Sequence, residues 1–328
     1  MTAPLPSLPA APPALDAGDG RPVASGRYLG AIAGLSTRAW DGDLGWRSRR
    51  RLQRKGWLYF SACTAEVSVG YAIVDAGLVA TAFVYVYDRR TRRLTEDKIT
   101  VPFGFAAGFA PDWRQPWSLA QGDRRWQVTP TADGWQVGYD SPRLGVAMAI
   151  TRRGAGLSAI SSAPGRPFHH TWKLCTLPVS LSLRRDGASV EMQAGGAVDF
   201  TLGYPPRASL WNWASLDGST ADGRRLGLNL VAQFMNGLEN ALWLGEELIP
   251  LAQATFDYDP ADLMQPWRIR TVDGLVDVTF IPDGQRAEHL NAWLLKSRFA
   301  QPFGRFEGRI AGQAVSGHGV VEEHEALW

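Results

Sequence analysis

The chain alternates between apolar and polar residues over short stretches, a period that is typical of β-strands rather than helices. In residues 81–87, Phe83, Tyr85 and Tyr87 lie on one side of the predicted strand, and Val84 and Val86 lie on the other. A strand that is apolar on both sides is expected to be buried on both faces. Comparable stretches recur about every 8–15 residues from residue 57 onward, which is typical of an antiparallel barrel or sandwich.

Turn signals separate the predicted strands. Asp-Gly pairs supply the backbone angles of tight hairpin turns. They predict turns at 133–134, 186–187, 217–218 or 222–223, 273–274 and 283–284. Short helical turns are expected only at 260–264 and 285–289, and no helix–strand alternation indicates a doubly wound fold. The predicted fold class is therefore all-β with few short helices.

The number of predicted strands exceeds what one barrel needs, since about eight to ten strands close a barrel of ligand size. A chain of 328 residues also exceeds the size at which a single core usually stops growing. We therefore predict two tandem antiparallel β-barrel-like domains, over residues 27–175 and 176–328. Residues 1–26 are rich in alanine and proline and are expected to form a disordered or extended tail.

Composition and charge narrow the class of protein. The chain holds 14 tryptophans and 35 glycines, which suits aromatic-lined strands joined by tight turns. A formal net charge of +2 gives no field that would attract nucleic acid. Cys63 and Cys175 lack metal or redox spacing, so free thiols in a reducing compartment are expected. Without an apolar run of membrane-spanning length or a secretory signal, the expected location is the cytoplasm.

Residues 47–55 form the densest basic cluster of the sequence. One interpretation is a contact with an anionic surface. The other is a solvated segment leading into the first strand, which we favour because no aromatic residues interleave with the basic ones.

Several catalytic patterns are missing from the sequence. No Gly-rich phosphate loop leads into a helix, and no Gly-x-Ser-x-Gly motif is present. His169 and His170 have no His or Cys partner at the spacing of a metal site. We therefore expect neither a metal nor a cofactor.

Residues 199–214 hold the densest mixture of polar and aromatic side chains. Asp199 lies among apolar neighbours, where burial would raise the pKa of its carboxyl and allow it to donate a proton. The alternative is a turn-capping residue or an ion pair with Arg207, and the sequence favours neither. If Asp199 is an acid, Tyr204 and Arg207 would orient it.

The segment Trp211-Asn212-Trp213 alternates along a predicted strand. Both indoles therefore share one face, and Asn212 points to the other. The tryptophans either form the apolar wall of a pocket or fill a core, and a core is the more common place for such residues.

Further polar residues lie near the predicted pocket. Asn229, Glu239 and Asn240 interrupt an apolar region, either as pocket groups or, as we favour, as braces between strands. His324 shares a strand face with Glu322 and could form an acid–base pair with it. The alternative for these two residues is a charged edge strand that prevents aggregation.

Several segments, taken in order, resemble the bacterial family known as domain of unknown function 2804 over residues 27–328. They include Leu228-Asn229-Leu230, Pro266-Trp267, Gln301-Pro302-Phe303-Gly304 and Glu322-Glu323-His324. A more distant resemblance joins His169-His170-Thr171-Trp172-Lys173, Asp199 and Trp211-Asn212-Trp213 to carotenoid 1,2-hydratase (hydroxyneurosporene synthase) and AttH-like proteins. Those proteins look like two lipocalin-type barrels in tandem. In the hydratases, an aspartate at the place of Asp199 is a proposed proton donor, but Phe200-Thr201 here replaces the histidine or asparagine that follows it.

Together these features predict a tryptophan-lined pocket for a lipid or isoprenoid-like hydrophobic small molecule. Asp199 would protonate an alkene, and the faces of Trp211 and Trp213 would stabilise the resulting cation. Water capture would give hydration, and proton loss would give isomerisation. The alternatives are a non-catalytic lipid-binding protein and a stress-related scaffold whose basic cluster contacts a partner. The oligomeric state stays open.

Overall fold

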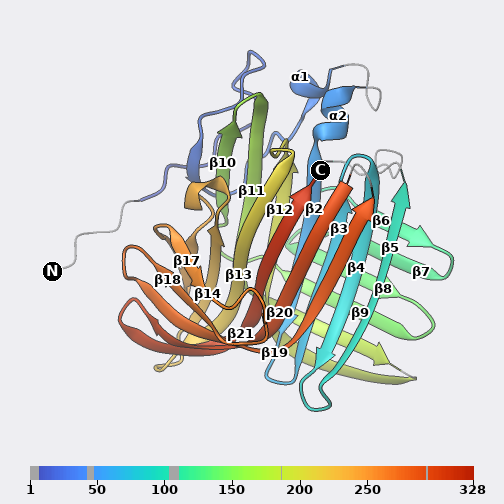
Figure 1. The fold of residues 1–328 in the computed structure, drawn as a ribbon, viewed down its shortest axis with the longest axis vertical. Helices are drawn as coiled ribbons and strands as arrows, with labels where there is room; N and C mark the ends of the chain where they lie inside the picture. The colour runs from blue at the N-terminus through green and yellow to red at the C-terminus, as the bar shows by residue number, and fades with distance from the viewer. Residues whose placement is uncertain (1–6, 43–47, 103–110, 186, 293–294) are drawn as a thin grey trace.

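Residues 7–42, 48–102, 111–185, 187–292 and 295–328 are described by the structure, a computed structural model. Nearly all of this chain lies in two strongly curved, barrel-like antiparallel sheets (Figure 1). The helices in the described residues are α1 (Arg38–Asp41), α2 (Arg49–Gln53) and the 3-10 turn η3 (Met235–Gly237). The predicted all-β fold with few short helices is therefore confirmed. None of the helices described is long and apolar enough to cross a membrane.

The first sheet has 12 strands in the part of the chain that the structure describes. Its main order is β5-β4-β3-β2-β12-β11-β9-β8-β7-β6, and β10 joins β1 to β11. The strands are β1 (Gly26–Leu29), β2 (Lys55–Cys63), β3 (Val67–Asp75), β4 (Val79–Asp88), β5 (Arg93–Pro102), β6 (Trp117–Gln121), β7 (Arg124–Pro130), β8 (Gly134–Asp140), β9 (Leu144–Thr151), β10 (Leu157–Ala163), β11 (Arg166–Arg185) and β12 (Ala188–Gly203).

The second sheet has nine described strands in the order β16-β15-β14-β13-β21-β20-β19-β18-β17. Long β13, β19, β20 and β21 form its centre, and shorter strands complete its curve (Figure 1). The strands are β13 (Ala208–Thr220), β14 (Arg225–Ala232), β15 (Ala241–Leu244), β16 (Glu247–Pro250), β17 (Ala254–Asp257), β18 (Trp267–Thr271), β19 (Val276–Ala292), β20 (Leu295–Ile310) and β21 (Gln313–Leu327).

The chain passes from the first sheet to the second between Gly203 and Ala208. The expected domain boundary at residues 175 and 176 falls instead inside β11. There the pairing of β11 with β12 shifts register between Leu174 and Leu177, and Thr176 has a φ of 59°. A β-bulge within one strand thus occupies the place of the expected boundary.

The predicted tail is extended in its described part. Isolated bridges join Ala10 to Leu29 and Ala14 to Gly34. Leu15 is only 1% exposed and belongs to the core of the first sheet. Residues 7–25 therefore pack along the first sheet, and residues 1–6 of the predicted tail lie outside the described residues.

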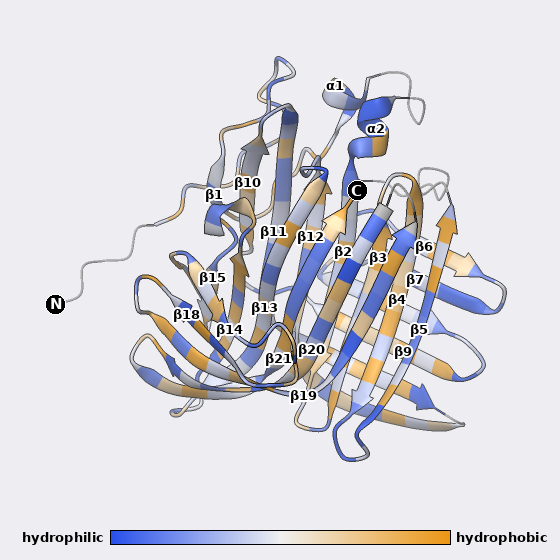
Figure 2. Ribbon diagram, viewed as in Figure 1, coloured by the Kyte–Doolittle hydropathy of each residue, from blue (hydrophilic) through white to orange (hydrophobic). Residues whose placement is uncertain are grey.

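Hydrophobic and hydrophilic residues alternate along many of the strands (Figure 2). The two faces of one strand can therefore pack in different cores. In β4, Val84 and Val86 pack in the core of the first sheet. Tyr85 and Tyr87 face the opposite way and join Trp213 and Phe303 in a separate cluster between the sheets. The phenolic oxygen of Tyr87 also donates to the carbonyl of Asp283 across this interface, at 2.8 Å. The prediction of a strand buried on both faces is confirmed.

Three predicted turns are present as expected, and four other predicted segments differ from the expectation. Gly223 and Gly274 take φ angles of 83° and 73° in turns between strands, and the turn at 133–134 joins β7 to β8. The pair at 217–218 is inside β13, and the pair at 283–284 is a bulge inside β19, where register shifts after Pro282. The expected helical turn at 285–289 is also wrong, because it belongs to β19, and 260–264 is a non-helical turn. Position 186 lies outside the described residues.

The basic cluster at 47–55 is largely paired within the protein. Arg51 and Arg54 form buried ion pairs with Asp75 and Asp41. The Lys55 ammonium donates to the carbonyl of Ala76 at 2.6 Å. Position 47 lies outside the described residues. This arrangement holds α2 against β2 and β3 and leaves little of the cluster for a partner.

Candidate functional site

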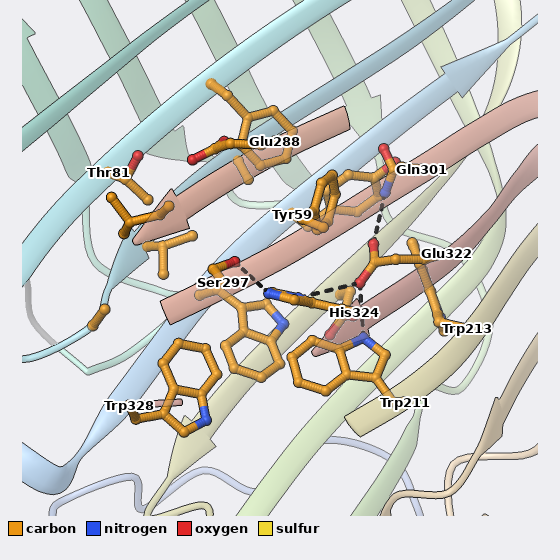
Figure 3. A pocket seen from close by; sticks show the side chains of 18 of the residues that line it. Tyr59, Thr81, Trp211, Trp213, Glu288, Ser297, Gln301, Glu322, His324 and Trp328 are labelled. Carbon is orange, nitrogen blue, oxygen red and sulfur yellow. Dashed lines mark hydrogen bonds and ion pairs between the residues drawn. The ribbon is translucent and has the colours of Figure 1, made fainter. Parts of the chain in front are cut away.

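A cavity of about 190 Å³ lies between the two sheets rather than inside either one (Figure 3). One water needs only about 10–15 Å³ of such space, so the cavity is of ligand size rather than a packing defect. The interiors of the sheets are filled by side chains such as Trp126, Trp135 and Trp267, each at most 1% exposed. The predicted ligand space therefore exists, but it is at the junction of the barrels.

On the first sheet, one row of cross-strand partners forms the wall. Strand pairing places its members side by side across six strands, from β11 to β5, and each lines the cavity. The row runs Lys173, Asp199, Tyr59, Ala72, Phe83, Lys98. It is apolar in the middle and charged at both ends.

A second row faces it from the other sheet, across β13, β21, β20 and β19. It consists of Trp211, His324, Phe299 and Glu288. The neighbouring pair Trp213 and Glu322 also lines the cavity. The two predicted tryptophans therefore wall a cavity, and the predicted alternation of β13 is confirmed.

Ion pairs between the sheets close the two ends of these rows. At the inner end, the Lys173 ammonium lies 2.8 Å from Glu239, and both side chains are 4% exposed. At the outer end, Lys98 pairs with Glu288, and these side chains are 31% and 25% exposed. The cavity is thus an elongated space whose inner end is buried and whose outer end is partly exposed to solvent.

Glu322 is the most perturbed acid of the cavity. Burial raises the pKa of its carboxyl to about 7, although hydrogen bonds from Trp211 and Gln301 oppose the shift. The indole Nε1 of Trp211 lies 2.7 Å from Oε1, and the amide Nε2 of Gln301 lies 2.9 Å from Oε2 (Figure 3). A carboxyl with this pKa can both hold and release a proton near neutral pH.

His324 lies beside Glu322 on β21, on the face that alternation predicts. Its Nδ1 is 3.8 Å from Oε1 of Glu322, and its Nε2 is 2.8 Å from the hydroxyl of Ser297. Burial lowers the pKa of the imidazole to about 3, so the ring is neutral. The centroids of His324 and Trp211 are 4.3 Å apart. A neutral imidazole packed in this way holds the neighbouring side chains in position and adds no charge to the cavity.

Asp199 lines the cavity, but its partner is Lys173 rather than Arg207. The Lys173 ammonium lies 2.5 Å from Asp199 and also contacts Glu239. Burial would lower the pKa of Lys173, but these two carboxylates raise it. Burial also raises the pKa of Glu239, against the opposing effect of Lys173. The inner end thus holds two carboxyls around one ammonium.

The outer end is built around Arg286, which is 4% exposed. Its guanidinium lies 4.2 Å from the ring of Phe83 and 5.1 Å from that of Phe299. Its Nη2 also donates to Glu288 at 2.8 Å. Its Nε also lies 3.3 Å from Oε2 of Glu96, so Glu96 and Glu288 together match the charges of Arg286 and Lys98.

Tyr204 and Arg207 do not line the cavity in the structure. The hydroxyl of Tyr204 donates to Asp41 at 2.8 Å, on the side of the first core. The guanidinium of Arg207 donates to the backbone oxygen of Trp328. The expectation that these two residues orient Asp199 is corrected, because the turn after β12 directs them elsewhere.

Asn212, Asn229 and Asn240 brace the second sheet. Asn212 points away from the cavity and donates to the hydroxyl of Tyr258 at 3.0 Å. Asn229 accepts from the indole of Trp213 at 2.8 Å and so holds that ring in the wall. Asn240 accepts from the backbone N–H of Val231 at 2.6 Å. The favoured interpretation of Asn229 and Asn240 as braces agrees with these bonds.

Several cavity residues escaped the sequence analysis, namely Lys173, Gln301, Lys98 and Arg286. Lys173 shares one face of β11 with His169, four positions earlier in the strand. Alternation along the strand shows which face Lys173 is on, but it does not identify the carboxyls that contact its ammonium. In the described part of the chain, no group of three His, Cys, Asp or Glu side chains is placed to hold a metal ion.

Two solved structures are similar to this chain. Kievitone hydratase from Nectria haematococca is 12% identical with a TM-score of 0.55, and the match covers 84% of this chain and 88% of that chain. An AttH-like protein from Nitrosomonas europaea is 13% identical with a TM-score of 0.43, covering 82% and 92%. At this identity the likeness to the hydratase shows a shared fold alone.

Sequence comparison gives a family but no characterised relative. No curated protein matches the chain. The family described as Domain of unknown function (DUF2804) matches residues 13–328, nearly the whole chain. The protein therefore belongs to the DUF2804 family, as its motifs indicated.

Proposed function

We propose that the cavity binds an apolar small molecule and that Glu322 donates a proton to a carbon–carbon double bond of this ligand. The observation that carries the proposal is a buried carboxyl whose pKa is raised to about 7, in a cavity walled by Trp211 and Trp213. Burial keeps the carboxyl protonated near neutral pH and excludes the water that would compete for its proton.

The proposal moves the acid from Asp199 to Glu322. Asp199 contacts the Lys173 ammonium at 2.5 Å, so its carboxyl is held in an ion pair at the inner end of the cavity. Glu322 instead accepts hydrogen bonds from Trp211 and Gln301, which hold both of its oxygens in place. These donors also stabilise the carboxylate that remains after proton transfer.

The reaction would begin as the proton of Glu322 forms a bond to one alkene carbon, which leaves a positive charge on the other. For hydration, water adds to this carbon and the added water then returns a proton to Glu322. For isomerisation, a neighbouring carbon loses the proton to Glu322, and the double bond moves. The indole faces of Trp211 and Trp213 would stabilise the cation. The shared fold with a protein named a hydratase is in keeping with the first outcome.

The test uses deuterium transfer from D₂O to carbon. Native mass spectrometry first identifies any molecule that co-purifies with the protein, and farnesol serves as an isoprenoid probe beside it. We expect carbon-bound deuterium with the wild type and none with Glu322→Gln. Glu325→Gln is the matched control, because Glu325 is on the same strand and its side chain is 66% exposed. Wild-type rates in Glu322→Gln would remove the proposed acid.

A binding protein without catalysis is the second candidate. It is favoured by the two hydrogen bonds to Glu322, since a carboxylate that only braces strands would be held in the same way. In that case a ligand co-purifies but no deuterium enters it, and Glu322→Gln keeps the affinity of the wild type.

A further inference from the structure

The inner end of the cavity carries more acid than base. Asp199 and Glu239 share the single ammonium of Lys173, at 2.5 and 2.8 Å. Glu322 is a third carboxyl in range, because Asp199 and Lys173 both influence its pKa. The side chains of these four residues are 4% to 12% exposed, so water screens their charges poorly.

Aromatic faces surround the same end. The Lys173 ammonium lies 5.9 Å from the centroid of Trp213, and the rings of Trp57 and Trp211 are nearly parallel, 6.4 Å apart. All three indoles line the cavity. The electron-rich faces of such rings attract positive charge, most strongly where water is excluded.

A buried acceptor adds a third and independent observation. Gln301 is 0% exposed and lines the cavity. Its Nε2 is used by Glu322, while its Oε1 has no hydrogen-bond donor among the described residues. A buried carbonyl oxygen without a donor is costly in a protein alone, and a ligand that brings a donor would remove that cost.

We propose that the inner end binds a positively charged group on an apolar body, with Trp211 and Trp213 around the charge and Asp199 and Glu239 balancing it. Two sources share this chemistry: a protonated tertiary amine that enters as a cation, and the cation formed in place by alkene protonation. The second source rests on the proposed function, and the first does not. The outer end adds no competing charge, because its two cations, Lys98 and Arg286, are paired with two carboxylates, Glu288 and Glu96.

The test compares N,N-dimethylbenzylamine with isobutylbenzene, which has the same shape but no charge. Binding to the full chain is measured by ligand-observed NMR at a pH where the amine is protonated. We expect the amine to bind at least about tenfold more tightly. Glu239→Gln should reduce this preference to less than about threefold, because it removes one of the balancing charges. Asp140→Asn, whose side chain is 79% exposed and outside the cavity, should leave the preference unchanged.

Equal or weaker binding of the amine, or binding of neither probe, would overturn the proposal. A preference that persists unchanged in Glu239→Gln and in Asp199→Asn would overturn the role given to the carboxyls. The comparison of the two probes on the wild type needs no variant, so it tests the preference for a cation even if those variants do not fold. Glu322→Gln separates the two proposals: loss of deuterium transfer with the amine preference retained supports both. Amine preference in a wild type that transfers no deuterium supports a cation-binding protein and removes the catalytic proposal alone.

Discussion

The indole N–H of Trp211 donates to the carboxyl of Glu322 at 2.7 Å, so one side chain both walls the cavity and holds its acid. Strand pairing across β13 and β21 brings the two residues together although more than a hundred positions separate them in the sequence. The pKa of the Glu322 carboxyl therefore depends on the position of an indole from another strand.

Replacing Trp211 with phenylalanine should raise the pKa of Glu322 further. The lost hydrogen bond favours the ionised carboxyl, so its removal favours the protonated form. We expect an upward shift of up to about one pH unit. The shift is measured by ¹³C NMR of the labelled glutamate carboxyl. Trp57→Phe is the control, because Trp57 also lines the cavity and its indole stacks at 6.4 Å on that of Trp211. An unchanged titration in Trp211→Phe would contradict the role of this bond.

Glu322→Gln should stabilise the protein at and above neutral pH. The pKa of Glu322 is raised by burial from 4.5 to about 7, so its buried carboxyl costs stability progressively as pH rises from 4.5 through 7. The glutamine has no such cost, and its stabilisation above pH 7 should be on the order of 2 kcal/mol. Below pH 4.5 the difference should vanish. Urea unfolding at a series of pH values measures it, and a difference that is independent of pH would count against a buried titrating acid.

His170 should weaken the fold in acid. Burial lowers its pKa from 6.5 to about 3, and neither ring nitrogen has a hydrogen-bond partner among the described residues. Between these values the unfolded chain binds a proton that the folded chain does not, so stability falls as pH decreases below 6.5. His170→Leu should reduce this loss by up to about 1.4 kcal/mol per pH unit. Thermal melts between neutral and acidic pH test it, with the exposed His289→Leu as the variant that should not change the slope.

Lys173→Met should be strongly destabilising, since it leaves Asp199 and Glu239 buried without their counter-ion. Removal of one partner from a buried ion pair costs about 3–5 kcal/mol. Adding Asp199→Asn and Glu239→Gln to the same protein should recover most of the loss, because the unpaired charges disappear. Denaturant unfolding of the single and triple variants gives the comparison. A triple variant as unstable as the single one would show that packing, and not charge, is what Lys173 provides.

The alternation of side chains predicted much of this fold. It placed Tyr85 and Tyr87 on one face of β4 and Val84 and Val86 on the other, and these faces belong to different cores. The number of strands placed the boundary at residues 175 and 176, which lie inside β11, whereas the chain passes from the first sheet to the second between Gly203 and Ala208. The Asp-Gly pair at 283–284 predicted a turn, and it is a bulge inside β19.

For the candidate site, the sequence predicted only which side chains share one face of a strand. Alternation showed that Trp211 and Trp213 share a face of β13 and that Glu322 and His324 share a face of β21, and strand pairing puts both pairs on the same face of the sheet. It could not show that Lys173 is the cross-strand neighbour of Asp199, because register between β11 and β12 depends on the long hairpin that joins them. That single contact turns a candidate acid into an ion pair. Among the described residues, no lysine or arginine forms an ion pair with Glu322, and this difference separates the two acids.

Because the cavity lies between the two sheets, its position also determines which fragments of the protein could hold a complete site. A cut in the segment 204–207 would separate the row that contains Asp199 from the row that contains His324, so neither fragment would hold a complete site. The first fragment would present a band of tyrosine and phenylalanine, and the second a band of tryptophan and phenylalanine, both of which are covered in the intact chain. Exposed apolar bands of this kind associate with other apolar surfaces in water. The two fragments, expressed together, should reassemble through this interface, and any activity of the cavity would report on that reassembly.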